Sequence, residues 1–512
     1  MTETKKHRIL LRPMQVELTA PAGTPLRDLL FEQGVEFPCG GQGRCRGCRV
    51  RVLEGTAEIN EPQRERLSAK ELESGWRLAC QCALLSDLVI ELRQWDAAIL
   101  ADETSFSFEP RPGFGVAVDV GTTTLVAQLL DLTTGHVLAV RTALNAQARF
   151  GADIMSRVQF AVTDGGQNTL EHLIRQQVAG LIHQLVFAAN VPISEIRDVV
   201  LVGNTVMHHL FSGIDVGPLS HYPFESEQLG LQMIPAADLG CDLEKKATVR
   251  FLPCLGGFVG SDVLAGVLAT RLGENQEFEG LIDLGTNGEI VIGDRNRLFC
   301  ASTAAGPAFE GARISMGMRA STGAICQVTV ENKHLACHVL GNGTPQGLCG
   351  SGLVDAVAAG LDLRTIEASG RFTNGAKEWT LAAPVALSQN DIRELQLAKA
   401  AIAAGTRILL ERCGAALDDV KKLYLAGAFG NYIRRVSAQR IGLINLSLDR
   451  VAPAGNTALL GAKLALFSVD GEDGSYSQLR SRIEHVPLKA DANFQEIFVE
   501  ELAFPQSTHV YS

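Results

Sequence analysis

Four cysteines near the start of the chain are spaced in a way that could bind metal. Cys39, Cys45 and Cys48 lie in one short segment with the spacing C-x5-C-x2-C, and Cys80 follows later in the sequence. A 2Fe-2S cluster needs four thiolates, commonly three from one loop and a fourth from elsewhere. A structural zinc site also uses four cysteines, but it prefers two C-x2-C pairs, and only one such pair is present. The spacing therefore favours a 2Fe-2S cluster held by these four cysteines.

The residues around these cysteines resemble the cluster loops of plant-type and adrenodoxin-type ferredoxins. The first gap is one residue longer than in the plant type and resembles the adrenodoxin type. The glycines of PCGGQGRCRGC suit a loop that wraps a cluster, because backbone N–H groups can then approach the sulfurs without obstruction. Cys82 is an alternative fourth ligand, since in a strand it would point to the same face as Cys80. Resemblance to the ferredoxin ending RLACQ favours Cys80.

A Gly-Thr-rich segment in the first third of the chain could bind phosphate. GFGVAVDVGTTTLVAQLLDLTTGHVLAV predicts two apolar strands joined at DVGTTT, and a third strand after the turn TTG. Asp119 would end the first strand and face a metal ion, and Gly121 would let backbone N–H groups converge on anionic oxygens. Three hydroxyls would add to these donors, those of Thr122, Thr123 and Thr124. For this motif alone, an ordinary polar hairpin turn is the alternative.

A second segment repeats this design. LIDLGTNGEIVI predicts an apolar strand, a turn and a returning strand, with Asp283 in the position of Asp119. The turn consists of Gly285, Thr286, Asn287 and Gly288. Two related phosphate hairpins indicate two related half-domains.

Two further segments follow the hairpins. VKKLYLAGAFGNYI predicts a strand and then a tight turn that can lie against a base or ribose. The turn residues are Gly427, Ala428, Phe429 and Gly430. GNTALLGAKLAL predicts a helix whose Gly455 and Gly461 allow close packing. A P-loop has little support, because the sequence contains no G-x4-G-K-S/T motif.

The order of these segments resembles the superfamily of actin, heat-shock chaperones and sugar kinases, in which two RNase-H-like lobes close over Mg-ATP. The resemblance implies that Asp119 and Asp283 hold the Mg²⁺ shell and order the attacking water. Phosphoryl transfer needs mainly positioning and charge neutralisation, which such residues can supply. Closure of the lobes about a hinge would supply a conformational stroke.

The elements that position these motifs predict a multidomain fold of the α/β and α+β classes. Residues 1–92 predict a β-grasp ferredoxin-like domain with an early strand pair, a short helix and a late strand, DLVIEL. Residues 93–113 lack periodicity and are expected to be a linker. Residues 114–213 are expected to form the first RNase-H-like lobe and residues 214–470 a second, larger one. Residues 471–512 predict a C-terminal extension with a short loop and one terminal element.

Composition limits the classes of function. A chain of 512 residues exceeds one core, because single cores stop growing near ~250–300 residues. The net charge of −11 argues against a nucleic-acid partner, which needs clustered Lys and Arg. No apolar run approaches ~18 residues and no signal peptide is evident, so we expect a cytoplasmic protein without a membrane partner. The remaining cysteines stand singly and are expected to be small buried hydrophobes.

The combination resembles the reductive activators of corrinoid-dependent methyltransferases, across nearly the whole chain. Supporting phrases are NAQARFGADIMSRV, VLVGNTVMHHLFSG, PCLGGFVGSDVLAG, ASTAAGPAFEGARI and GLCGSGLVDAV. The resemblance implies ATP-dependent transfer of one electron from the 2Fe-2S cluster to a corrinoid protein, which returns inactive Co(II) to Co(I). It also implies an upstream electron donor, and a homodimer is compatible with it. ATP can drive such a step only by distinguishing conformational states.

Other functions are compatible with the same residues. A kinase of this superfamily with a regulatory cluster would need a catalytic aspartate aimed at a substrate hydroxyl, and the sequence identifies none. A redox-sensing or electron-transfer protein could use ATP binding as a switch. An activator of radical dehydratases would need a cluster shared between subunits, which the separate four-cysteine domain disfavours.

Overall fold

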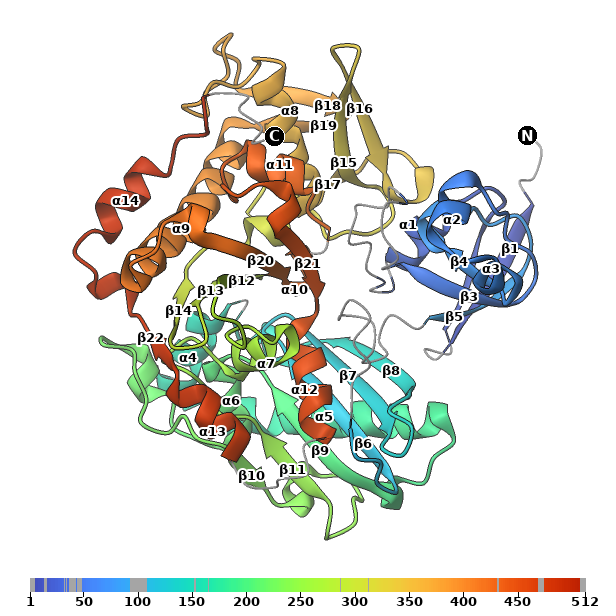
Figure 1. Ribbon diagram of the computed structural model, residues 1–512, viewed down its shortest axis with the longest axis vertical. Coiled ribbons are helices and arrows are strands. Elements are labelled where there is room, and N and C mark those ends of the chain that lie inside the picture. The colour runs from blue at the N-terminus through green and yellow to red at the C-terminus, as the bar shows by residue number, and fades with distance from the viewer. Residues whose placement is uncertain are drawn as a thin grey trace.

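The computed structural model describes most of the chain as a small N-terminal domain beside a larger body of two lobes (Figure 1). The residues described are 5–12, 16–31, 33, 35, 43, 48–92, 108–151, 153–163, 165–285, 287–311, 313–430, 432–467 and 474–506.

The N-terminal domain is a mixed five-stranded sheet in the order β2-β1-β5-β3-β4. β1 pairs antiparallel with β2 and parallel with β5, and β3 pairs antiparallel with β5 and β4. These strands are β1 (Lys6–Arg12), β2 (Val16–Pro21), β3 (Arg49–Glu54), β4 (Trp76–Leu78) and β5 (Leu88–Leu92). Leu26 and Leu30 of α1 (Leu26–Phe31) lie in one apolar core with the strands. This confirms the predicted strand pair, helix and late strand of a β-grasp domain.

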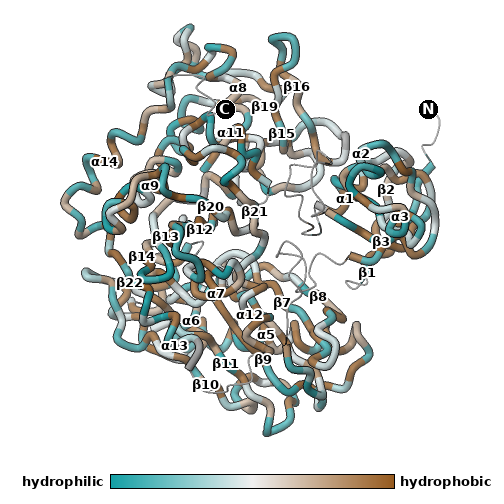
Figure 2. The backbone as a smooth tube through the Cα atoms, in the orientation of Figure 1, coloured by the Kyte–Doolittle hydropathy of each residue, from teal (hydrophilic) through white to brown (hydrophobic). Residues whose placement is uncertain are grey.

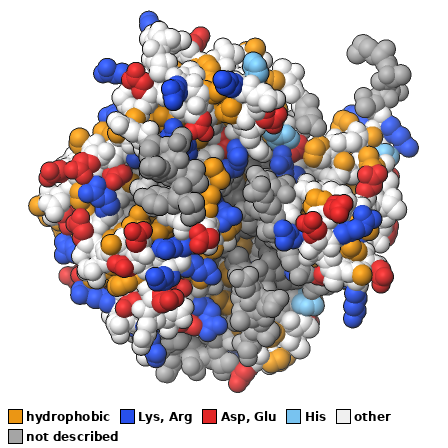
Figure 3. All heavy atoms as spheres, turned by 45° about the horizontal axis from the view of Figure 1, so that its top comes forward, with side chains coloured by type: hydrophobic (Ala, Val, Ile, Leu, Met, Phe, Trp, Pro, Cys, Tyr) orange, Lys and Arg blue, Asp and Glu red, His pale blue; other side chains and the backbone are white. Residues whose placement is uncertain are grey.

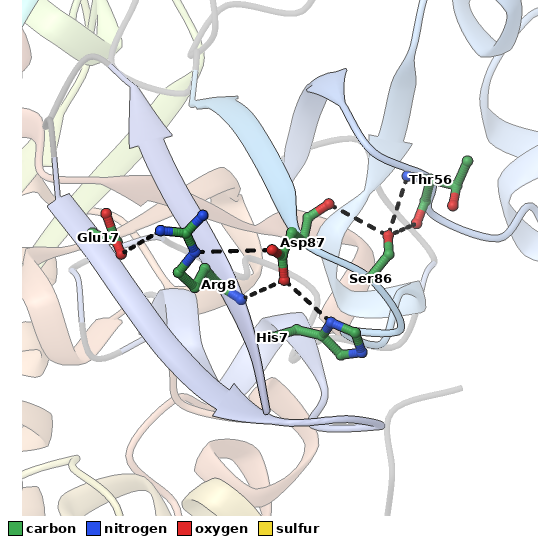
Figure 4. Close-up of polar contacts among 6 residues, drawn as sticks. All are labelled: His7, Arg8, Glu17, Thr56, Ser86 and Asp87. Carbon is green, nitrogen blue, oxygen red and sulfur yellow. Dashed lines mark hydrogen bonds and ion pairs between the residues drawn. The ribbon is translucent and has the colours of Figure 1, made fainter. Parts of the chain in front are cut away.

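A polar network fastens the start of β1 to the turn before β5 (Figure 4). Oδ1 of Asp87 accepts a hydrogen bond from the backbone N–H of Arg8 at 3.0 Å and lies 3.2 Å from Nδ1 of His7. Next to Asp87, Oγ of Ser86 accepts a hydrogen bond from the backbone N–H of Thr56 at 3.4 Å. The hydrogen bond from Arg8 is the main reason why the pKa of Asp87 is lowered. The network thus stabilises the parallel pairing that closes the domain.

The first lobe contains a six-stranded sheet in the order β10-β11-β9-β6-β7-β8. Its first three strands in the sequence form the predicted antiparallel meander, and β9 and β11 extend it in parallel. The strands are β6 (Phe114–Val120), β7 (Thr124–Asp131), β8 (Val137–Leu144), β9 (Ile196–Val202), β10 (Gln232–Ile234) and β11 (Thr248–Phe251). The predicted end of this lobe at residue 213 would cut the sheet, because β10 and β11 hydrogen-bond to it.

The second lobe repeats this sheet in the order β21-β20-β12-β13-β14-β22. Again an antiparallel meander is followed by parallel strands on its open side. The strands are β12 (Phe278–Leu284), β13 (Gly288–Gly293), β14 (Leu298–Thr303), β20 (Val420–Ala426), β21 (Val451–Gly455) and β22 (Ile483–His485). The prediction of two related half-domains is confirmed.

The C-terminal residues belong to the second lobe, which corrects the prediction of a separate extension from residue 471. β22 pairs in parallel with β14, so the chain end completes the sheet instead of leaving it. Two helices flank β22, α13 (Gly474–Ser481) and α14 (Phe494–Glu500), where one terminal element was expected. α14 packs on the long helix α9 (Gln389–Cys413).

Small sheets that the sequence did not predict are inserted in the second lobe. β15 (Ala324–Glu331), β16 (His334–Val339) and β17 (Gly347–Leu348) form one of them, and α8 (Gly350–Asp362) packs against β15. β18 (Glu378–Ala382) and β19 (Val385–Ser388) form the other. The β15–β17 sheet lies next to the N-terminal domain in Figure 1.

Two helices join the lobes. α12 (Thr457–Phe467) packs on α7 (Ser261–Thr270) and also contacts β6 and β9 of the first lobe. A Cβ on Gly461 would lie 2.2 Å from the carbonyl oxygen of Ala265, so only glycine permits this approach and the predicted close packing is confirmed. Gly455 instead ends β21. Figure 2 shows hydrophobic segments in brown inside both lobes and more hydrophilic segments in teal at outer loops.

Candidate nucleotide site and cluster ligands

The first phosphate hairpin joins β6 to β7, as predicted. Asp119 lies one residue before the end of β6, opposite Val126 of β7. A Cβ on Gly121 would lie 2.4 Å from the carbonyl oxygen of Thr124, so the turn requires glycine there. Asn145 and Asn204 hold the turn, because their Nδ2 atoms donate to the Gly121 carbonyl and the Thr122 hydroxyl, each at 2.9 Å.

The second hairpin joins β12 to β13 with the same position of its aspartate. Asp283 lies one residue before the end of β12, but its cross-strand partner is Glu289. The N–H of Gly285 donates to the carbonyl of Asn287 at 3.0 Å, which closes the turn. At Gly288 a Cβ would lie 2.7 Å from Ile402, so the glycine lets β13 approach α9. Thr286 lies outside the described residues.

The fold brings the two hairpins together between the lobes. Burial raises the pKa of Asp119 to about 6, and burial together with the charge of Asp119 raises the pKa of Asp283 to about 7. Nδ2 of Asn456, at the start of α12, donates to Oδ2 of Asp119 at 2.9 Å. Oγ1 of Thr123 donates to Oε2 of Glu310 at 3.5 Å across the lobes. Both predicted aspartates therefore share one site.

The predicted adenosine turn also reaches this site. It forms α10 (Gly427–Gly430), a helical turn after β20. Gly427 has a φ of +82°, and a Cβ there would lie 2.4 Å from Oδ1 of Asp283, so the turn touches the second hairpin. The ring of Phe429 is buried and stacks on Phe309 with centroids 4.7 Å apart, so it packs the core. The side chain of Ala428 lies outside the described residues.

A further carboxylate that the sequence did not predict lies in the same site. Asp262 is in the first turn of α7, and burial and the charge of Asp283 raise its pKa to about 8. Burial and the charge of Asp262 raise the pKa of Glu289 well above its usual value. Acidic residues are common in the first turn of a helix, where they interact favourably with the helix dipole. The position of Asp262 in the sequence therefore did not indicate a functional site. The local signal was its glycine-rich neighbourhood, PCLGGFVGSD.

These carboxylates suit a hard cation. Like charges taken from water repel unless a cation or protons neutralise them, and Mg²⁺ prefers carboxylate and phosphate oxygens. Within the described ranges, no three such side chains converge as a preformed metal site. Mg²⁺ keeps several waters and typically takes one or two protein carboxylates, so this arrangement fits magnesium that arrives with a nucleotide.

The described part of the cluster site contains two of the four predicted ligands. Cys48 is buried just before β3, and Cys80 is half-buried in the turn η1 (Ala79–Gln81). The N–H of Ala79 donates to the carbonyl of Cys48 at 3.0 Å, so the two cysteine segments lie side by side. Cys39 and Cys45 lie outside the described residues.

Cys82 lies in the core of the N-terminal domain. Its Sγ is 3.5 Å from the carbonyl oxygen of Leu78, and burial raises its pKa to about 12. Its sulfur therefore packs among apolar side chains of the domain and contacts the backbone of β4. The prediction that the scattered cysteines are buried holds for Cys254, Cys300 and Cys349. The other four are only partly buried: Cys241, Cys326, Cys337 and Cys413.

Comparison with known proteins identifies three regions of the chain. Residues 9–85 match a family model described as a 2Fe-2S iron-sulfur cluster binding domain. Residues 114–275 match the RACo middle region, and residues 277–511 match the C-terminal domain of RACo, the ASKHA domain. The chain thus carries an iron-sulfur domain followed by the middle and ASKHA domains of RACo.

Relatives align with most or nearly all of the chain. The chain is 31% identical to the corrinoid activation enzyme RamQ of Eubacterium limosum, over 97% of this chain and 99% of the relative. It is 26% identical to the Co(II) methylated amine-specific corrinoid protein reductase of Methanosarcina barkeri, over 76% and 77% of the two chains. A solved structure titled reductive activator for corrinoid, iron-sulfur protein superposes with a TM-score of 0.70 at 28% identity, covering 99% of each chain.

The face in Figure 3 carries interspersed Lys/Arg and Asp/Glu side chains and lacks a continuous basic patch among its coloured residues. In the part of the chain that the structure describes, no helix has the length and apolarity needed to cross a membrane.

Proposed function

We propose that this chain, which belongs to the family of reductive activators of corrinoid proteins, uses ATP to drive one-electron reduction of a corrinoid protein from inactive Co(II) to Co(I). The observation that carries the proposal is the meeting of two aspartate hairpins between lobes that are joined to an iron-sulfur domain. An upstream donor would reload the cluster. We also place the protein in the cytoplasm, where cellular reductants keep cysteine thiols reduced.

Asp119 and Asp283 are the proposed holders of the Mg²⁺ shell, with Asp262 beside them. Bound Mg²⁺ would neutralise phosphate charge. Asn456 orients Asp119 through a hydrogen bond of 2.9 Å. Because Gly427 has no side chain, the adenosine turn can approach the carboxylate of Asp283 closely. The first hairpin would take the phosphates through its backbone and threonine hydroxyls.

The proposed cluster is of the 2Fe-2S type, with Cys48 and Cys80 joined by Cys39 and Cys45. Cys82 is left out of the proposed ligand set, because Cys80 matches the ferredoxin ending RLACQ and the sulfur of Cys82 contacts the carbonyl of Leu78. The cluster would supply one electron at a time.

Contacts between the N-terminal domain and the second lobe support coupling of the two sites. The hydroxyl of Tyr432, two residues after α10, donates to the carbonyl of Val35 at 3.2 Å. Nε2 of His338 on β16 lies 3.0 Å from Oδ1 of Asp28 on α1. The adenosine turn and the cluster domain are therefore connected directly, and nucleotide binding can favour one arrangement of the domains.

The test is anaerobic reduction of a Co(II) corrinoid protein followed by visible spectroscopy. With reductant and Mg-ATP we expect the Co(I) spectrum to appear, and without ATP we expect little Co(I). ATP hydrolysis should rise when the corrinoid protein is added. The proposal would be contradicted if the corrinoid protein did not change the rate of ATP hydrolysis and no Co(I) formed.

Two cysteine variants test the cluster ligands. Cys80→Ser should lose the two-iron visible spectrum and all Co(I) formation, whereas the matched control Cys82→Ser should keep both. Retention of the spectrum in Cys80→Ser would remove Cys80 from the ligand set.

A further inference from the structure

A buried arginine lies directly behind the first phosphate hairpin. Arg157 is on α4 (Ile154–Thr163), and its side chain has no exposed surface. Its Nη2 donates to the carbonyl of Thr122 at 2.6 Å, and its Nε donates to the carbonyl of Gly151 at 2.9 Å. Nη1 donates to Oε1 of Gln147 at 3.3 Å. One guanidinium therefore ties the hairpin to two other segments of the first lobe.

The positive charge of Arg157 is only partly balanced by the described residues around it. Burial lowers the pKa of Arg157 to about 10, so the guanidinium is protonated at neutral pH. No carboxylate of the described residues forms an ion pair with it, and the charge that acts on it is that of Asp153. By contrast, buried Lys399 pairs with Glu501 at 3.4 Å. A buried cation is costly unless opposite charge lies near it, so an anion at the hairpin would add to the attraction that Asp153 supplies.

The hairpin offers the place for that anion. Side chains hold the carbonyls of Gly121 and Thr122 toward the lobe, through Asn145 at 2.9 Å and Arg157 at 2.6 Å. Fixing the carbonyls of a tight turn on one side directs its peptide N–H groups to the other side, where they can meet anionic oxygens. The positive charge of Arg157 would also attract anionic oxygens to the turn.

We propose that Arg157 is a positioning residue for the nucleotide phosphates, fixing the first hairpin through Thr122 and adding the positive charge that the phosphates balance. This inference rests on the proposed function, because it assumes that the hairpin binds a nucleotide. The proposed role belongs to a residue of α4, which lies outside both hairpin motifs.

The test compares the affinities of ATP and AMP, measured by calorimetry on the full-length protein without Mg²⁺. Arg157→Met should weaken ATP binding about 10- to 100-fold, the effect expected for losing hydrogen bonds from a charged group, and should weaken AMP binding less. The ratio of the two affinities is the decisive readout, because a general loss of structure would lower both alike. Arg175→Met is the matched control. Arg175 is on α5 (Gln167–Ala189) of the same lobe, where it pairs with Glu171 at 2.8 Å and donates to the carbonyl of Phe211 instead of the hairpin.

Arg157→Lys keeps the charge but cannot bind all three acceptors, so we expect an ATP-to-AMP affinity ratio between those of the wild type and Arg157→Met. It also decides the question if Arg157→Met does not fold. Wild-type ratios in a folded Arg157→Met, or in Arg157→Lys, would overturn the inference. Failure of the wild type itself to bind ATP would instead overturn the proposed function.

Discussion

The hairpin between β6 and β7 has a cation behind it, whereas the hairpin between β12 and β13 stands among carboxylates. Val126 lies opposite Asp119, and Arg157 donates a hydrogen bond to the carbonyl of Thr122 in the turn. Opposite Asp283 lies Glu289, whose pKa is raised by burial and by the charge of Asp262. The backbones are alike, but the surroundings suit an anion on the first hairpin and a cation on the second. We infer that both lobes supply an aspartate for the metal, while the phosphates are recognised mainly by the first hairpin.

The largest effect that tests this division should come from Asp283→Asn. We expect Mg-dependent ATP hydrolysis to fall about 10²- to 10³-fold, as when one electrostatic stabiliser of a transition state is removed. Affinity for metal-free ATP should stay the same or rise, because one negative charge near the phosphates is gone. Steady-state hydrolysis and calorimetry without metal measure the two. If Mg-dependent hydrolysis and the affinity for metal-free ATP fell by the same factor, the second hairpin would not be specialised for metal.

Asp355, outside both hairpins, tests whether burial alone produces a raised carboxylate pKa. Burial raises its pKa from 3.8 to about 6 although Arg434 lies 3.6 Å away and opposes the shift. The folded protein thus holds this proton longer than the unfolded chain, and stability falls as pH rises from about 4 to about 6. Wild type should lose on the order of 1–3 kcal/mol over this range relative to Asp355→Asn.

Urea unfolding at pH 4.5 and pH 7 measures that difference. Asp87→Asn is a control with the opposite sign, because the lowered pKa of Asp87 gives a contribution that is lost as pH falls. Parallel pH profiles of wild type and Asp355→Asn would show that Asp355 is ionised in the folded protein at both pH values.

A smaller effect is expected from the contact that orients Asp119. Asn456→Ala removes the hydrogen bond of 2.9 Å to Oδ2 of Asp119. One hydrogen bond to a charged group contributes about 1.5 kcal/mol, so Mg-ATP turnover should fall about tenfold. Asn456→Asp, which adds a negative charge at the same place, should be worse. Unchanged turnover in Asn456→Ala would show that Asp119 does not need the hydrogen bond from Asn456.

The smallest effect should come from Glu289→Gln. The variant removes one of the mutually repelling carboxylates of the second hairpin, and its amide oxygen can still accept the hydrogen bond of Ser302. We expect the metal-free protein to gain about 1 kcal/mol of stability in urea unfolding at pH 8. Ser302→Ala is the control for the hydrogen bond alone. A loss of stability would mean that the carboxylates do not repel one another in the absence of metal.

Local sequence patterns predicted the elements that depend on short-range physics. Alternating apolar residues with Gly-Thr turns specified both hairpins, because a tight turn needs glycine wherever a Cβ would strike the backbone, as at Gly121. Gly461 predicted close helix packing for the same steric reason. The boundary at residue 213 and the detached C-terminus were wrong, because strand pairing between distant segments, such as β22 with β14, leaves no local pattern.

The sequence by itself determined the order of the motifs, the cysteine spacing and the positions of Asp119 and Asp283 within their hairpins. Only the tertiary structure placed Asp262 and Glu289 beside Asp283, turned Cys82 into the core and put Arg157 behind Thr122. The physical reason is that charge and burial act through space. A carboxylate or guanidinium acquires its role from neighbours that are far away along the chain.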